Sequence, residues 1–179
     1  MNKTVLIWSF IAVLLFWGVG AYNRLVRLRA LAIASFVPLQ LKYGLYTALV
    51  QSHFEMQLGA NQLSARSGLI NAALEFEASL KTASTQPLDS LVMRALETAR
   101  QVLQSSWDKV CAEPQDLAGE QLMQTLLKQW DDISTQVQRD KAEYLKRIQE
   151  YNQSIEQFPA KLLAWLFRFE PAFWDREAT

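Results

Sequence analysis

The sequence predicts an all-α protein, with an N-terminal transmembrane helix followed by a long antiparallel bundle of about four helices. Three observations predict this fold. The chain opens on an uncharged apolar stretch, only 6 glycines and 5 prolines interrupt its 179 residues, and apolar residues in the body recur at three- and four-residue steps. Periodic apolar residues with few glycines and prolines are typical of helices, whereas an all-β chain must turn often.

The apolar stretch from Val5 to Ala21 contains 17 residues without a charge. As a helix it is ~26 Å long at ~1.5 Å per residue, close to the ~30 Å of a bilayer core. Lys3 precedes the stretch. Three basic residues follow it: Arg24, Arg27 and Arg29. We therefore predict a membrane anchor with a basic interface junction over residues 1–29, and a helical-bundle domain over residues 30–179.

A cleavable signal peptide is the alternative interpretation of this stretch. Residues 19–21, Val-Gly-Ala, would then form the small-residue cleavage site. Only one lysine precedes the apolar core, however, and arginines directly after the cleavage point would oppose export. These features favour an uncut, single-pass anchor. The excess of arginines after the span favours a cytoplasmic body under the positive-inside rule.

The composition argues against several classes of function. Lys and Arg together number 18, as do Asp and Glu, so no overall field favours nucleic acid as a partner. Cys111 is the only cysteine and His53 the only histidine, which disfavours a disulfide or a metal site. Glu75 and Glu77 are two residues apart and do not share a helix face. We therefore expect no enzymatic activity, no cofactor and no metal.

The helical pattern continues beyond the anchor. Four apolar residues after Tyr22 keep the spacing of one helical face: Leu25, Leu28, Ala32 and Phe36. Pro38 is the first residue expected to break or kink this helix. A second segment is then predicted to run to about Thr82, with kinks at its glycines, Gly44, Gly59 and Gly68.

Two further helices are predicted in the rest of the body. A turn is expected over Lys81–Gln86, with Pro87 just inside a third helix over Leu88–Val110. The fourth helix is predicted from Leu117 to about Gln157. Its apolar seam consists of Leu122, Leu126, Trp130, Ile133, Val137, Tyr144, Ile148, Tyr151, Ile155 and Phe158. Such a sustained seam indicates a scaffold and permits homo-oligomerisation.

The chain closes on residues too apolar to be left in water. They are Leu162, Leu163, Trp165, Leu166, Phe167, Phe169, Phe173 and Trp174. They either cap the open end of the bundle or lie on a membrane or partner surface. A bundle cap is the interpretation we favour at this point.

Both ends of the chain resemble the LemA family. Tyr22-Asn23, with Leu25, Val26, Leu28 and Arg29 after an anchor, resembles the opening of that family. The tyrosine-asparagine, phenylalanine-proline and terminal-aromatic pattern of the family is matched by Tyr151, Asn152, Ile155, Phe158, Pro159, Ala164, Phe167, Phe169, Phe173 and Trp174. The chain departs from the family at Leu145, which follows Tyr144 where an asparagine is usual.

The resemblance implies a single-pass protein of the bacterial inner (plasma) membrane, in a family without an established enzymatic activity. We expect a non-enzymatic scaffold or adaptor at the cell envelope, with the lipid bilayer and unidentified envelope or cytoplasmic proteins as partners. The alternative is a membrane-associated lipid-handling protein or enzyme that uses the aromatic segment Leu162–Trp174. Tyr151 and Asn152 are expected to register helices through buried polar groups, or alternatively to line a ligand or partner groove.

Overall fold

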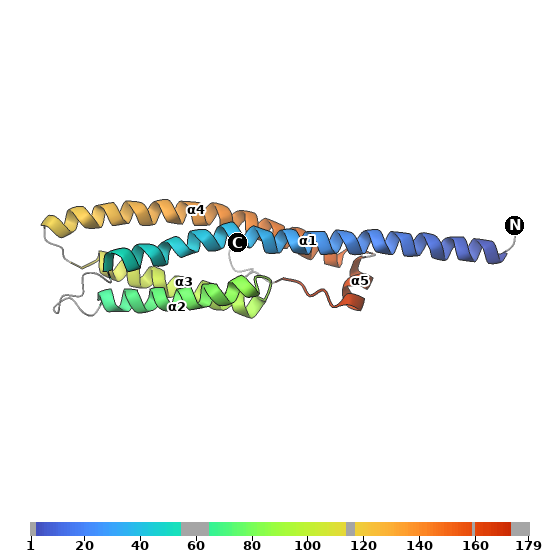
Figure 1. The fold of residues 1–179 in the computed structure, drawn as a ribbon, viewed down its shortest axis with the longest axis horizontal. Helices are drawn as coiled ribbons and strands as arrows, with labels where there is room; N and C mark the ends of the chain where they lie inside the picture. Colours follow the sequence, from blue (N-terminus) through green and yellow to red (C-terminus); the bar gives the residue numbers. More distant parts are fainter. Residues whose placement is uncertain (1–2, 55–64, 114–116, 159, 173–179) are drawn as a thin grey trace.

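The chain folds into long helices aligned along one axis, with a short helix across one end (Figure 1). The computed structural model describes residues 3–54, 65–113, 117–158 and 160–172. The helices within them are α1 (Lys3–Phe54), α2 (Ala65–Thr85), α3 (Ser90–Cys111), α4 (Leu117–Glu156) and α5 (Ala160–Phe167). This arrangement confirms the predicted all-α fold.

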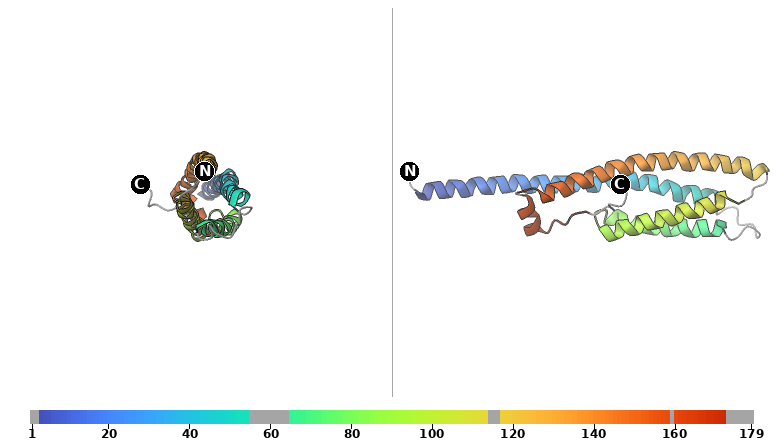
Figure 2. Two further views of the ribbon diagram at one scale, coloured as in Figure 1. Left: turned by 90° about the vertical axis from the view of Figure 1, so that its left-hand side faces the viewer. Right: turned by 180° about the vertical axis from the view of Figure 1, so that it is seen from behind.

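The second half of α1 forms an antiparallel four-helix bundle with α2, α3 and α4 (Figures 1 and 2). Successive helices run in opposite directions, and the most extensive packing joins α1 to α4 and α2 to α3. The first half of α1 extends beyond the bundle as a single projecting helix. The bundle therefore has one end marked by the projecting helix and one end remote from it.

The two helix boundaries predicted within the first 82 residues, at Pro38 and at Thr82, were wrong. The helix continues through Pro38 to Phe54 without interruption, because Phe36 and Leu39 are buried on the bundle side while the proline ring is exposed. Packing of this apolar face outweighs the one hydrogen bond that a proline removes. The predicted single segment to Thr82 is in fact two antiparallel helices, since α1 ends at Phe54 and α2 begins at Ala65.

The glycines of that segment have different outcomes. Gly44 and Gly68 lie within α1 and α2, and neither interrupts its helix. Gly59 lies outside the described residues.

The turn between α2 and α3 falls later than predicted. Helix α2 continues to Thr85, and Pro87 lies in the turn rather than inside the next helix. Asp89 is the N-cap of α3: its carboxylate accepts hydrogen bonds from the backbone N–H groups of Leu91 at 2.8 Å and Val92 at 3.1 Å. An aspartate at this position satisfies donors that have no partner within the helix, so it fixes the start of α3.

Helix α4 has the predicted bounds to within one residue and buries most of its predicted seam. The buried members are Leu126, Trp130, Ile133, Val137, Tyr144, Ile148, Tyr151 and Ile155. The two ends of the seam, Leu122 and Phe158, are exposed instead. The bundle core is therefore built around the middle of α4.

Aromatic rings connect three helices within this core, toward the end remote from the projecting helix. Trp107 of α3 stacks on Trp130 of α4 at a centroid distance of 4.2 Å and an interplanar angle of 3°. Tyr46 of α1 contacts the same Trp130 ring at 4.5 Å and forms a 2.9 Å hydrogen bond with Ser134. The indole N–H of Trp130 donates to the Gln104 side chain at 3.2 Å. Each buried polar atom of Trp130 and Tyr46 thus has a partner, which sets the helix register.

A cluster of charged side chains joins α3 to α4, nearer to the projecting helix than the aromatic rings are. Glu97 accepts hydrogen bonds from the Arg100 guanidinium, the shortest at 2.6 Å, and pairs with Lys141 of α4 at 3.3 Å. Burial alone would raise the pKa of the Glu97 carboxyl. The hydrogen bond from Arg100 and the charges of Arg100 and Lys141 outweigh burial, so the pKa of Glu97 lies below its ordinary value.

Because the pKa of Glu97 is lowered in the folded protein, its contribution to stability is present above the ordinary value of 4.5 and is lost as the pH falls below it. We expect Glu97→Gln to lower the free energy of unfolding at pH 7 by about 1.5–3 kcal/mol, the range for a hydrogen bond to a charged group. This difference should disappear on acidification. Urea unfolding of the detergent-solubilised protein across that pH range measures it.

Glu143→Gln is the matched control, because Glu143 pairs with Arg147 on the exposed surface of α4. Exposed pairs contribute little, so this variant should stay close to wild type at every pH. If Glu97→Gln lowered the free energy of unfolding by the same amount in acid as at pH 7, the charge of Glu97 would not be the cause of the loss.

Candidate membrane-interface site

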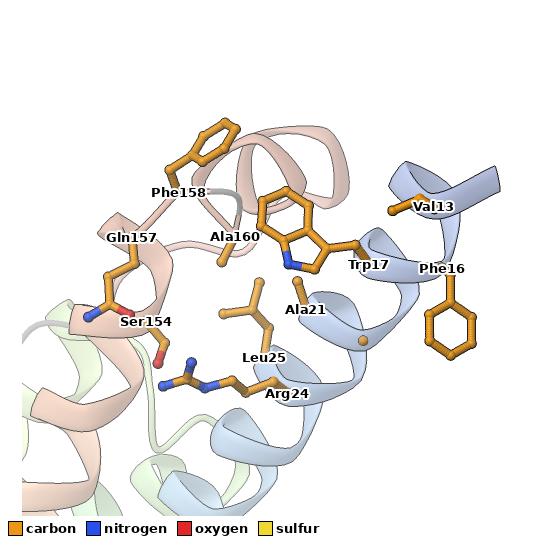
Figure 3. A pocket seen from close by; sticks show the side chains of 11 residues that line it. Val13, Phe16, Trp17, Ala21, Arg24, Leu25, Ser154, Gln157, Phe158 and Ala160 are labelled. Atoms are coloured by element: carbon orange, nitrogen blue, oxygen red, sulfur yellow. The ribbon is translucent and has the colours of Figure 1, made fainter. Parts of the chain in front are cut away.

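The candidate site lies where α1 leaves the bundle and meets the end of α4 and the start of α5 (Figure 3). A groove of about 460 Å³ opens between these elements. It is lined by Val13, Phe16, Trp17, Gly20, Ala21, Arg24, Leu25, Ser154, Gln157, Phe158 and Ala160. Figure 3 shows the Arg24 side chain directed across the groove toward Ser154. The groove is thus apolar along the projecting helix and polar toward the bundle.

The exposure of α1 changes abruptly at this site. In the projecting half, large apolar side chains are exposed, as in Phe16 with 85% of its surface accessible. From Leu25 onward, which is fully buried, one face of the same helix enters the core. The helix is long and apolar enough to cross a membrane by length and composition, and its apolar window is almost entirely unburied. The projecting half is therefore the part available to lipid.

Aromatic residues from both ends of the chain meet at the site. Tyr22 of α1 contacts Phe167 at a centroid distance of 4.8 Å and Phe169 at 6.0 Å. Five residues earlier on α1, Trp17 contacts Phe158 at 5.7 Å. These contacts hold α5 beside the last turns of the projecting apolar stretch.

Tyr151 and Asn152 of α4 bind the backbone that follows α5. The Tyr151 hydroxyl donates to the carbonyl of Glu170 at 3.0 Å. The Asn152 side chain donates to the carbonyl of Ala172, and its amide oxygen accepts from the Ala172 N–H at 2.9 Å. One amide side chain thus satisfies both backbone groups of a buried residue, much as a neighbouring strand would. The pair secures the chain after α5 and does not register two helices.

The C-terminus of α5 carries a strained residue. Arg168 adopts a φ of 53°, in the left-handed region that glycine prefers. The backbone N–H of Phe169 donates to the carbonyl of Ala164 at 2.9 Å, which closes the helix in a Schellman-type cap. The cap turns the chain back toward Tyr151 and Asn152.

Basic side chains surround the site. Arg24, Arg27 and Arg29 are exposed on α1 directly after the apolar stretch, and Lys161 and Arg168 are exposed on α5. Within residues 22–30, 154–158 and 160–172 the only acidic residues are Glu156 and Glu170. The described part of this end of the molecule therefore carries a net positive charge, which favours an anionic surface.

The structure brings together four of the residues singled out from the sequence: Tyr22, Tyr151, Asn152 and Phe169. Asn23 is exposed on α1 beside them, Phe158 is exposed at the mouth of the groove, and Pro159 lies outside the described residues. Sequence reasoning missed Ala172 as the partner of Asn152, because a backbone partner leaves no side-chain signal. Trp17 was also missed, because nothing in the sequence distinguishes it from the other apolar residues of the predicted anchor.

Asn152→Leu keeps approximate side-chain size but removes both hydrogen bonds to Ala172. We expect the segment after α5 to lose about 1–3 kcal/mol of local stability, because two buried backbone groups lose their partner. Hydrogen–deuterium exchange should be faster in peptides that cover residues 168–172, while α2 and α3 keep wild-type protection. Asn23→Leu, at an exposed position, is the matched control, and equal exchange in the two variants would contradict this role of Asn152.

Comparison with known proteins gives one family. A model described as LemA family matches residues 53–175. No curated protein and no solved structure matches the chain. The matched region covers α2, α3, α4 and α5 with only the last two residues of α1, and it includes the segment held by Tyr151 and Asn152.

Proposed function

The chain belongs to the LemA family, whose model matches more than half of it, and from this premise we propose that it is a non-enzymatic, membrane-anchored scaffold at the bacterial cell envelope. The observation that carries the proposal is the continuity of α1. One helix runs from Lys3 to Phe54. Its large apolar side chains between residues 11 and 19 are exposed, and its second half packs in the bundle core. The anchor and the bundle therefore share one stiff element, which suits a protein that holds a surface at a fixed place on a membrane.

The described residues support a binding rather than a catalytic role. No group of three or more His, Cys, Asp or Glu side chains within them is placed to hold a metal ion. The tyrosines with the most strongly raised pKa, Tyr43 and Tyr144, owe that shift chiefly to burial in the core, and neither lines the groove beside α1. The long exposed faces of α2, α3 and α4 remain as surfaces on which partner proteins would assemble.

Photo-crosslinking in intact membranes tests the scaffold proposal. A benzoylphenylalanine residue is placed at Leu74 of α2 or at Val102 of α3, two exposed apolar positions on the outside of the bundle. We expect discrete crosslinked products that vanish when the anchor is inactivated by arginines at Leu14 and Leu15. Diffuse products that are the same with and without a working anchor would contradict the proposal.

The bundle is placed on the cytoplasmic side in this proposal, since three arginines follow the span and one lysine precedes it. Labelling with a membrane-impermeant maleimide in intact spheroplasts tests this side. Cys111 is a poor reporter, because burial and the Asp108 carboxylate raise the pKa of its thiol. Thr85→Cys in a Cys111→Ser background gives an exposed thiol at the end of α2. Labelling only after lysis is expected, and labelling of intact spheroplasts would place the bundle outside.

The groove favours a second candidate function, the handling of a membrane lipid. Its apolar wall continues the projecting half of α1, and Arg24 lies at its polar end. If a lipid occupies it, phospholipid should co-purify with the protein and be lost in Gly20→Leu, which fills the groove where an added side chain meets open space. Gly18→Leu is the matched control on the same helix, since Gly18 also faces open space but does not line the groove. Absence of bound lipid in the wild-type protein would remove this candidate.

A further inference from the structure

Helix α5 leaves its largest side chains uncovered. Leu162, Trp165, Leu166 and Phe167 are all more than half exposed, and Trp165 is exposed over 81% of its surface. The residues that α5 buries are small: Ala160 and Ala164, four positions apart on one face. The prediction that this segment caps the bundle is therefore wrong for these four residues, whereas Leu163 and Phe169 are partly buried against the core. Phe173 and Trp174 lie outside the described residues. The small face packs on α1 and α4, Phe167 contacts Tyr22 with one side of its ring, and Leu162, Trp165 and Leu166 are left uncovered.

The place of α5 along α1 indicates what covers these side chains. Phe167 contacts Tyr22, which is the first residue after the uncharged stretch, and Phe158 contacts Trp17, about 7–8 Å farther along the helix axis. Both contacts fall in the last turns of the projecting half, just before Arg24. When the apolar stretch crosses a bilayer, this level is the boundary between acyl chains and headgroups.

The direction and charge of α5 fit the same boundary. Figures 1 and 2 show α5 running across the direction of α1, so it lies in the membrane plane when α1 stands along the membrane normal. Lys161 and Arg168 flank its exposed apolar residues, and Arg24, Arg27 and Arg29 lie at the neighbouring level of α1. A short helix with an apolar face, an exposed tryptophan and basic flanks is typical of a helix that lies in the lipid headgroup region.

We propose that α5 is a second membrane-contacting element, which inserts Leu162, Trp165 and Leu166 into the acyl–headgroup boundary of an anionic leaflet beside the α1 span. The inference rests on the proposed anchoring by α1. The inference adds that the protein contacts the membrane at two points, α1 and α5. Two contacts fix the tilt and rotation of the bundle, whereas a single helix would leave the bundle free to rotate about the span. The apolar residues of α5 are covered by lipid and not by a second protein.

Depth-dependent fluorescence quenching of the full chain in vesicles tests this inference. Single cysteines in a Cys111→Ser background are labelled with nitrobenzoxadiazole at Leu162 or Trp165 of α5. The protein is reconstituted into vesicles of phosphatidylcholine and phosphatidylglycerol that contain nitroxide lipids with the quencher near the headgroup or deep in the acyl chain. Phe16 of α1 reports on the span, and Leu127, an exposed leucine of α4 toward the remote end of the bundle, is the matched control.

We expect quenching at Leu162 and Trp165 by the shallow nitroxide, several-fold stronger than at Leu127, and quenching at Phe16 by the deep nitroxide. Quenching at Phe16 with none at α5 would overturn the inference and leave the anchor intact. A blue-shifted but unquenched label at Trp165 would show that protein covers α5, which also overturns it. No quenching at Phe16 would overturn both the anchor and the inference.

Discussion

Trp130→Ala is expected to lower the free energy of unfolding by about 3–5 kcal/mol, the range for removal of a large buried aromatic side chain. Trp130 is 6% exposed and contacts Trp107 of α3 and Tyr46 of α1. Its removal leaves a cavity among three helices and deprives the Gln104 side chain of its donor. Urea unfolding of the detergent-solubilised protein, followed by circular dichroism, measures the loss.

Trp165→Ala is the matched control, because it removes the same side chain from an exposed position on α5. A surface substitution of this kind is expected to change the free energy of unfolding by no more than about 0.5 kcal/mol. If Trp130→Ala lowered the free energy of unfolding as little as Trp165→Ala, packing of the aromatic cluster would not be a main source of the bundle's stability.

Arginine at both Leu14 and Leu15 is expected to release the protein from the membrane. Each charged residue at the centre of a span costs about 2.5–3.5 kcal/mol of insertion free energy, so the pair shifts the partition by several orders of magnitude. Carbonate extraction followed by ultracentrifugation should move the double variant from the membrane pellet to the supernatant.

The matched control places arginines at Leu41 and Leu45, two exposed leucines on the bundle half of the same helix. This variant carries the same added charge and should stay in the membrane pellet. Retention of the Leu14 and Leu15 double variant in the pellet would mean that the projecting half of α1 is not what holds the protein there.

The parts of the fold that were predictable from the sequence are those set by periodicity. The seam of α4 identified Trp130, Tyr144 and Tyr151 as core residues, and the structure buries all three. Such a seam is visible because a long helix repeats the same spacing many times, which a single turn or cap does not.

The outcome at Pro38 was not predictable from local propensity. A proline removes one hydrogen bond from a helix, but burial of Phe36 and Leu39 on either side keeps α1 continuous. The reversal between Phe54 and Ala65 was missed because apolar spacing continues into α2. The glycine and asparagine at positions 59 and 61 are the signal that would have indicated it.

The residues of the candidate site could be predicted from the sequence, but the groups that they contact could not. Tyr22, Tyr151 and Asn152 were selected from a family-like pattern, and they lie at one end of the bundle. Their partners are the ring of Phe167 and the backbone of Glu170 and Ala172, which no sequence spacing reveals. The exposed side of α5 was likewise undetermined, because a short apolar helix has the same composition whether protein or lipid covers it.

A distance measurement along α1 shows whether this helix is continuous across the junction between its projecting half and the bundle. Spin labels are attached at Leu15→Cys and Ser52→Cys in a Cys111→Ser background, and the protein is placed in lipid nanodiscs. Most of α1 lies between the two labels. Pulsed electron paramagnetic resonance should give one narrow distribution near about 55 Å, from a rise of ~1.5 Å per residue. A broad distribution, or a main peak much shorter than this, would show a hinge in α1 and contradict a rigid link between membrane and bundle.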